Sequence, residues 1–168
     1  EKLDGGPSDN WELGTRDTGA YATMSDVKEY MCWLGKEFTK NNDSREQIKA
    51  AGKAIQDYER KITDALVNGL DNLKGLADFE DVEIIGGVNN SSREGLVSFR
   101  IRDYPSEKIV RYLNHQGIRT HTRKCDHYSE NILAPLGWND CVRVSICHYN
   151  TLNEIKKFLS CMACLLYT

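Results

Sequence analysis

The stretch CVRVSICHYNTLNE at residues 141–154 limits the possible folds more than any other part of the chain. Its first half alternates apolar and polar side chains, in the order Val142, Arg143, Val144, Ser145, Ile146 and Cys147. Alternation with a period of two predicts a β-strand with one apolar face and one polar face. We therefore expect the side chain of Arg143 to point away from the hydrophobic core.

A helix is expected to begin soon after this strand. Thr151 and Glu154 have the spacing of a capping box, in which a hydroxyl and a carboxylate accept hydrogen bonds from the free amides at a helix start. The apolar residues that follow recur three and four positions apart, which predicts that the helix packs on the sheet. They are Leu152, Ile155, Phe158, Leu159 and Met162.

Two further helices are expected in the first part of the chain. Apolar residues spaced by three and four predict one helix over 21–38 and a long second one from Ser44, where Ser44 and Gln47 have capping-box spacing. Another helix is expected to begin at Pro105 and to end at Gly117.

The remaining patterns predict a small sheet. Runs of β-branched and other apolar residues, bounded by turn residues, predict strands at 82–85, 96–101 and 118–121 in addition to the strand near Arg143. The order of the elements is helix, helix, strand, strand, helix, strand, strand, helix. It indicates an α/β sandwich in which helices cover a mixed or antiparallel sheet of about four strands.

The composition argues against several kinds of partner and against a membrane-spanning or disulfide-bonded protein. The chain has 168 residues, 22 of them basic and 25 acidic, so its net charge of −3 gives no support to a nucleic-acid partner or an anionic membrane surface. No apolar run reaches the roughly 20 residues that a membrane-spanning helix needs. The six cysteines are scattered through the expected helices and strands, which favours reduced thiols and a cytoplasmic setting over a disulfide framework.

Three segments of the chain resemble a known family, and two of them are described first. Residues 141–154 resemble the end of the small C-terminal domain of class V aminotransferases, the fold-type I pyridoxal-phosphate (PLP) enzymes that include cysteine desulfurases and selenocysteine lyases. The segment WELGTRDTG at 11–19 resembles a family segment in which an aromatic residue precedes Glu-x-Gly-Thr. In the family this threonine hydrogen-bonds the PLP phosphate held by the other subunit of a dimer. The resemblance implies that role for Thr15, and a homodimer.

The resemblance also implies a domain organisation. Residues 1–18 would be a segment that connects to a large domain, and residues 19–168 would be the small C-terminal α/β domain. A PLP enzyme needs a lysine that bonds to the cofactor aldehyde, and in the family it follows a histidine in the large domain. No lysine follows a histidine here. We therefore expect this chain to be the C-terminal portion of a longer enzyme that acts on an amino acid. Alone, the chain is expected to be inactive.

Arg143 is the first candidate for the substrate site. A planar guanidinium forms two parallel, charge-assisted hydrogen bonds to a carboxylate, and the family's arginine at this strand position holds the α-carboxylate of the substrate. On the sequence alone, a solvated surface side chain is the commoner fate of an arginine on a strand. The resemblance shifts the interpretation of Arg143 toward substrate binding.

The segment GIRTHTRKCDH at 117–127 is the second candidate region. It resembles the family loop Gly-Ile-x-Arg-x-Gly-x-x-Cys, whose cysteine accepts sulfur in desulfurases, and it implies substrate binding by Arg119 and sulfur transfer at Cys125. Neighbouring cations favour a thiolate at Cys125, whereas the adjacent Asp126 opposes it. The loop also departs from the family in spacing and has His121 in place of the glycine. Cysteine or selenocysteine lyase, transaminase and epimerase activities therefore all stay open.

Interpretations from other classes stay open as well. A free-standing domain could bind an anion or an acidic peptide through the patch 119–124. A zinc site is a further alternative, with neighbouring cations against it. Its three potential ligands are His121, Cys125 and His127. Cys161 and Cys164 have the spacing of a redox pair, although two small buried thiols on a helix are the simpler interpretation.

Overall fold

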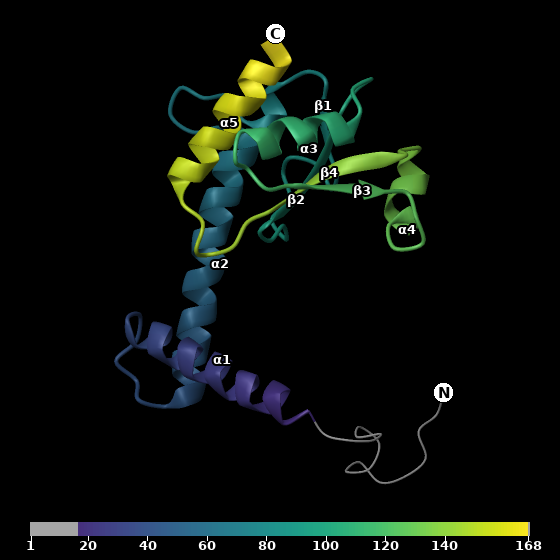
Figure 1. Ribbon diagram of the computed structural model, residues 1–168. Coiled ribbons are helices and arrows are strands. Elements are labelled where there is room, and N and C mark those ends of the chain that lie inside the picture. Colours follow the sequence, from purple (N-terminus) through teal and green to yellow (C-terminus); the bar gives the residue numbers. More distant parts are fainter. Residues whose placement is uncertain (1–16, 168) are drawn as a thin grey trace. The chain divides into compact units, whose positions relative to one another are not determined.

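A computed structural model describes residues 17–167 of the chain (Figure 1). The chain divides into two compact units, with the boundary between Ala54 and Ile55. Among the residues described, no helix combines the length and the apolar character needed to cross a bilayer.

The first unit contains helix α1, Thr18–Lys36, and the beginning of helix α2, Ser44–Asn68. α1 begins after Asp17, whose carboxylate accepts a hydrogen bond from the amide of Ala20 at 3.0 Å. Both predicted helices are therefore confirmed, with small differences at their ends.

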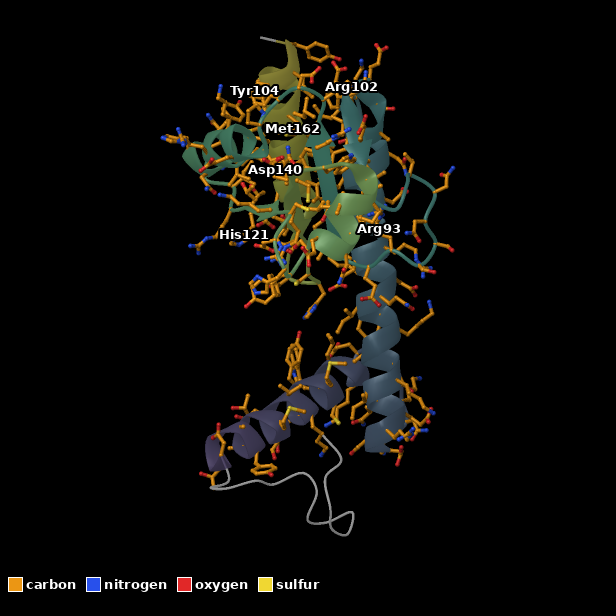
Figure 2. The ribbon with its side chains drawn as sticks, turned by 90° about the vertical axis from the view of Figure 1, so that its right-hand side faces the viewer. Arg93, Arg102, Tyr104, His121, Asp140 and Met162 are labelled. Carbon is orange, nitrogen blue, oxygen red and sulfur yellow. The ribbon has the colours of Figure 1, made fainter. Side chains whose placement is uncertain are left out.

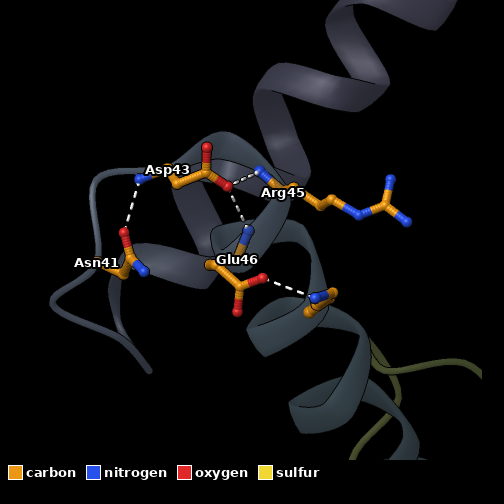
Figure 3. Close-up of polar contacts among 5 residues, drawn as sticks. Asn41, Asp43, Arg45 and Glu46 are labelled. Atoms are coloured by element: carbon orange, nitrogen blue, oxygen red, sulfur yellow. Dashed lines mark hydrogen bonds and ion pairs between the residues drawn. The ribbon is translucent and has the colours of Figure 1, made fainter.

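The start of α2 corrects one prediction (Figure 3). The Asp43 carboxylate accepts hydrogen bonds from the amides of Arg45 and Glu46, at 3.0 and 3.1 Å. The Gln47 side chain is buried and donates to a loop carbonyl, so it does not reach back to cap the helix. The predicted capping box of Ser44 and Gln47 is wrong, because the aspartate one position earlier already satisfies the first free amides.

The second unit is built on a four-stranded antiparallel sheet in the order β1–β2–β4–β3. The strands are β1 Val82–Ile84, β2 Leu96–Ile101, β3 His121–Lys124 and β4 Asp140–Ser145. The predicted fold class, a small sheet of about four strands combined with helices, is confirmed.

The position of β3 differs from the prediction at 118–121. The amide of Ile118 donates to the carbonyl of Leu113 at 2.9 Å, which ties this residue to the end of the preceding helix. Pairing with β4 begins at His121, opposite Arg143, and runs to Lys124. The strand therefore starts later than its sequence pattern indicates, because the helix end holds the chain before it.

Helices cover one face of this sheet (Figure 1). They are α3, Ser106–His115, α5, Leu152–Tyr167, and the part of α2 in the second unit. Their apolar side chains meet those of the strands in one core, where Phe99 of β2 lies edge-on to Phe158 of α5 with ring centroids 6.5 Å apart. Three shorter helices complete the second unit: η1 Leu76–Asp78, α4 Glu130–Leu133 and η2 Ala134–Leu136.

The predicted capping box at the start of α5 is confirmed. The Glu154 carboxylate accepts hydrogen bonds from the amide and the hydroxyl of Thr151, at 2.6 and 3.0 Å. The Thr151 hydroxyl in turn accepts from the Glu154 amide at 3.3 Å. Hydrogen bonds from the backbone and then the side chain of Thr151 lower the pKa of Glu154 from its usual 4.5.

This cap predicts a pH-dependent contribution to stability. Because the pKa of Glu154 is lower in the folded chain, its contribution is complete above the usual pKa and is lost as the pH falls through the lowered folded value. At pH 7, Glu154→Gln should reduce the free energy of unfolding by about 0.3 to 1 kcal/mol. Urea denaturation of both forms between pH 7 and pH 2.5 measures the difference. A difference that does not shrink toward acidic pH would contradict this assignment.

Candidate functional site

Arg143 lies on the sheet face opposite the main core, as the alternating pattern predicts. Its neighbours Val142 and Val144 are buried in the core cluster, whereas Arg143 itself is half-buried. Residues directly opposite each other in an antiparallel pair share a face of the sheet. Arg143 is opposite Ser98 of β2 and His121 of β3, so these three side chains belong to the same face.

A cavity of about 270 Å³ opens on this face. Three of its lining side chains are arginines, namely Arg93, Arg123 and Arg143, and none of the described residues that line it is acidic. Its walls also include apolar side chains, among them Ile132 and Leu133 of α4. An apolar-walled cavity that holds several cations and no carboxylate is suited to an anionic ligand, and to a carboxylate in particular.

Arg143 carries an unsatisfied donor in this cavity. Its Nε atom is buried and has no hydrogen-bond partner among residues 17–167. A buried donor without an acceptor costs about 1–3 kcal/mol. A carboxylate bound in the cavity would reach this atom only if the atoms that cover it move aside, so the role of Arg143 in substrate binding stays a prediction.

Arg93 is held in place by the backbone. Its guanidinium donates to the carbonyls of Ile85, at 3.0 Å, and Gly87. It lies beside α4 (Figure 2), and its partial burial lowers its pKa through desolvation. Arg93 therefore fixes the loop before β2 while it adds positive charge to the cavity wall.

A second, smaller core adjoins the cavity and shares several of its lining residues. Leu133, Trp138 and Cys141 are buried together, with Ile85 packed against them. The guanidinium of Arg100 lies 4.4 Å from the centroid of the Trp138 ring. A cation over an aromatic face is attracted by the ring quadrupole. These contacts anchor the segment after β3, which carries α4, on the face of the sheet that holds Arg143.

The structure places two different cysteines near this region. Cys141 is buried and lines the cavity, and burial is the main cause that raises the pKa of its thiol. Cys125, the candidate sulfur acceptor, is exposed directly after β3, where its amide donates to the carbonyl of Asn139 at 2.8 Å. Cys125 does not line the cavity that contains Arg143.

The structure separates the two ends of the basic patch 119–124. Arg123 lines the Arg143 cavity, whereas Arg119 is exposed and lines another cavity, of about 410 Å³, together with Lys157. Arg119 and Arg143 are therefore not brought together in one cavity. Thr15, the candidate for the cofactor phosphate, lies outside the described residues.

The structure gives no geometric support to the zinc site or to the redox pair of Cys161 and Cys164. Within the described part of the chain, no three His, Cys, Asp or Glu side chains converge on a position that could hold a metal ion. None of the six cysteines forms a disulfide bond. The expectation of two buried thiols on α5 is wrong for Cys164, which is exposed, while Cys161 is partly buried.

Sequence reasoning missed Arg93, Arg123 as a cavity residue, and the whole wall formed by α4. Arg93 and Arg123 are far in the sequence from β4 and are brought beside it by strand pairing, whereas α4 ends only a few residues before β4. A usable signal was present at Arg123, because it lies two positions after His121 and so shares a face with it in a strand. The four-residue helix α4 is too short for its periodicity to be recognised.

Comparison with known families gives a match to the model described as "Aminotransferase class-V", over residues 45–158, which is more than half of the chain. Two curated relatives are called "Probable cysteine desulfurase". The protein from Treponema pallidum is 27% identical over 109 residues, which cover 64% of this chain and 26% of that protein. The protein from Borreliella burgdorferi is 30% identical over 87 residues, which cover 52% of this chain and 20% of that protein.

Solved structures show the same fold. The apo cysteine desulfurase from Thermococcus onnurineus NA1 is 25% identical, with a TM-score of 0.58, and the match covers 74% of this chain and 30% of that chain. The cysteine desulfurase CsdA from Escherichia coli is 17% identical, with a TM-score of 0.62 and coverages of 93% and 32%. A NifS-like protein from Rickettsia africae is 15% identical, with a TM-score of 0.60 and coverages of 99% and 39%.

The matched region spans about a quarter or less of the length of the two curated relatives. The fold, the family match and the relatives agree on one assignment. This chain belongs to the class-V aminotransferase family and is similar, within it, to part of a cysteine desulfurase.

Proposed function

We propose that the chain is the small C-terminal domain of a PLP-dependent enzyme of the cysteine desulfurase type, with residues 1–18 as the connecting segment and 19–168 as the domain. The family match and the partial coverage of its relatives support this proposal. The fragment would be inactive alone, because the lysine that bonds to PLP would lie in the large domain. The complete enzyme would be a cytoplasmic homodimer.

The observation that carries the proposal is the cavity lined by Arg143 and two further arginines. The Arg143 guanidinium would bind the α-carboxylate of an amino acid through two parallel hydrogen bonds and so orient the amino acid. Arg123 would add positive potential, and the apolar wall from α4 would exclude water, which strengthens both interactions. When bound, PLP would supply the electron sink that such chemistry requires.

Three assignments in this proposal come from the family resemblance. Thr15 would hydrogen-bond the PLP phosphate of the other subunit. Cys125, whose exposure leaves its thiol accessible, would accept sulfur from a cysteine substrate. Arg119 would assist the anionic side of the substrate, although it lines a different cavity from Arg143. A hydroxyl, a thiol and a guanidinium are the groups that these roles need.

The test is made on the natural full-length protein. It should take up PLP, with a visible absorption band, and release sulfide from L-cysteine. Cys125→Ala should abolish sulfide release without loss of bound PLP, because the thiolate is the group that attacks sulfur. Cys164→Ala, which removes another exposed thiol, is the matched control and should retain activity. A colourless full-length protein that takes up no PLP would end the enzyme proposal in favour of an anion-binding domain.

A further inference from the structure

The second cavity, of about 410 Å³, forms where two strands of the sheet separate. Pairing between β3 and β4 stops at His121 and Arg143, and the segments 118–120 and 144–146 then line opposite sides of the cavity. All of its lining residues belong to the second unit. None of them is shared with the cavity that contains Arg143.

The floor of this cavity is apolar and its rim carries two cations. Ile155 and Phe158 of α5, which are buried, belong to the floor, while Arg119 and Lys157 supply the charge. Gly117 has φ +73°, and a Cβ built on it would lie 3.5 Å from Nζ of Lys157. The ammonium group of Lys157 therefore lies close to the space that a side chain at residue 117 would occupy. An apolar floor with a cationic rim suits an amphipathic anion.

The rim contains one carboxylate, that of Glu154, and it is already engaged. It accepts hydrogen bonds from the amide and hydroxyl of Thr151 at the start of α5. Neither Arg119 nor Lys157 forms a salt bridge with any residue in the range 17–167. The charged lining residues are therefore two cations and one carboxylate, which leaves a net charge of +1 at the cavity.

A buried hydroxyl in the wall gives an independent indication of a ligand. Thr120 is only 4% exposed, lines the cavity, and its Oγ1 has no hydrogen-bond partner among the described residues. Buried hydroxyls are nearly always hydrogen-bonded, so this one needs an explanation. A ligand oxygen in the cavity would provide the missing acceptor once the atoms that cover Oγ1 move aside.

We propose that this cavity binds a small carboxylate with a short apolar chain. The carboxylate contacts Arg119 and Lys157 and accepts a hydrogen bond from the Thr120 hydroxyl, while the chain lies against Ile155 and Phe158. This cavity is separate from the Arg143 cavity, and the proposal does not depend on PLP chemistry, although it uses Arg119, which the family resemblance assigns to the substrate.

Titration of the ¹⁵N-labelled chain of residues 1–168 with hexanoate, followed by amide chemical shifts, tests this proposal. Saturable shifts are expected at residues 117–120 and 144–146, and 1-hexanol of the same chain length should produce much weaker ones. Lys157→Gln should weaken hexanoate binding at least about fivefold, as loss of a charged contact does. Lys156→Gln is the matched control, because Lys156 is paired with Asp71 at 2.7 Å and does not line the cavity.

Thr120→Val tests whether the Thr120 hydroxyl binds the ligand or is a buried, unsatisfied group with no role in binding. It should weaken hexanoate binding and also raise the melting temperature of the free chain, because it removes a buried unsatisfied group without a change of shape. Equal shifts with hexanol, or unchanged affinity in Lys157→Gln, would overturn the proposal. Shifts confined to Ser98 and Arg143 would overturn it as well, while they would support the substrate cavity.

Discussion

Replacement of Arg143 by glutamine in the full-length enzyme is expected to lower kcat/KM for its amino-acid substrate by about 10- to 150-fold. This range corresponds to the loss of a charged hydrogen bond worth about 1.5–3 kcal/mol. Glutamine keeps a polar side chain, although a shorter one, and cannot form the paired, charge-assisted bonds of a guanidinium. Because the α-carboxylate is bound before and during reaction, most of the loss should appear as a higher KM. Steady-state kinetics measure it.

The control for this prediction is Arg102→Gln. Arg102 also carries a guanidinium near the sheet, but it is exposed, does not line the cavity, and lies 3.7 Å from Asp81 and 3.6 Å from Glu83. A surface ion pair of this kind contributes little, so its loss should leave kcat/KM within about twofold. Equal effects of the two substitutions would mean that charge near the sheet, and not a contact made by Arg143, is responsible.

Phe99→Ala should be the most destabilising of the substitutions considered, with a loss of about 3–5 kcal/mol in the free energy of unfolding. The Phe99 side chain is fully buried in the core and contacts Phe158 edge-on. Its removal leaves a cavity between β2 and α5. Because the neighbouring Ser98 lines the Arg143 cavity from the other face of the same strand, weaker packing at Phe99 should also loosen that cavity.

Urea denaturation of the chain measures this effect, with Phe38→Ala as the control. Phe38 is 59% exposed, so its truncation removes little buried surface and should change the free energy of unfolding by less than about 0.5 kcal/mol. A loss below about 1 kcal/mol in Phe99→Ala would mean that the core formed by the sheet and α5 is not packed as described.

The strand–turn–helix region from Arg143 to Glu154 could be predicted from the sequence because its determinants are local. Alternation places Val142 and Val144 in the core and Arg143 on the other face, and the capping box depends on residues three positions apart. Local rules also predicted the order of the strands and longer helices within residues 17–167, but not the short helices η1, α4 and η2. They failed where two local signals competed, as at the start of α2, where Asp43 takes the role assigned to Ser44.

The walls of the candidate site could not be predicted, because they are assembled from segments far apart in the sequence. Strand pairing brings Arg93, which precedes β2, and Arg123, in β3, to Arg143. Ile132 is placed there by the packing of α4 through Leu133. The shift of β3 has the same origin, since a contact between Ile118 and the end of α3 decides where pairing can begin. Contacts of this kind depend on the tertiary structure and leave no periodic signal in a single sequence.

The central claim is that Arg143 recognises a substrate carboxylate, and comparison of L-cysteine with cysteamine tests it most directly. The two compounds share the thiol and the amine, but cysteamine has no carboxylate. The account predicts that the full-length enzyme prefers L-cysteine in kcat/KM, and that Arg143→Gln reduces this preference by about 10-fold or more while cysteamine turnover hardly changes. A preference for L-cysteine that survives in Arg143→Gln would contradict the account.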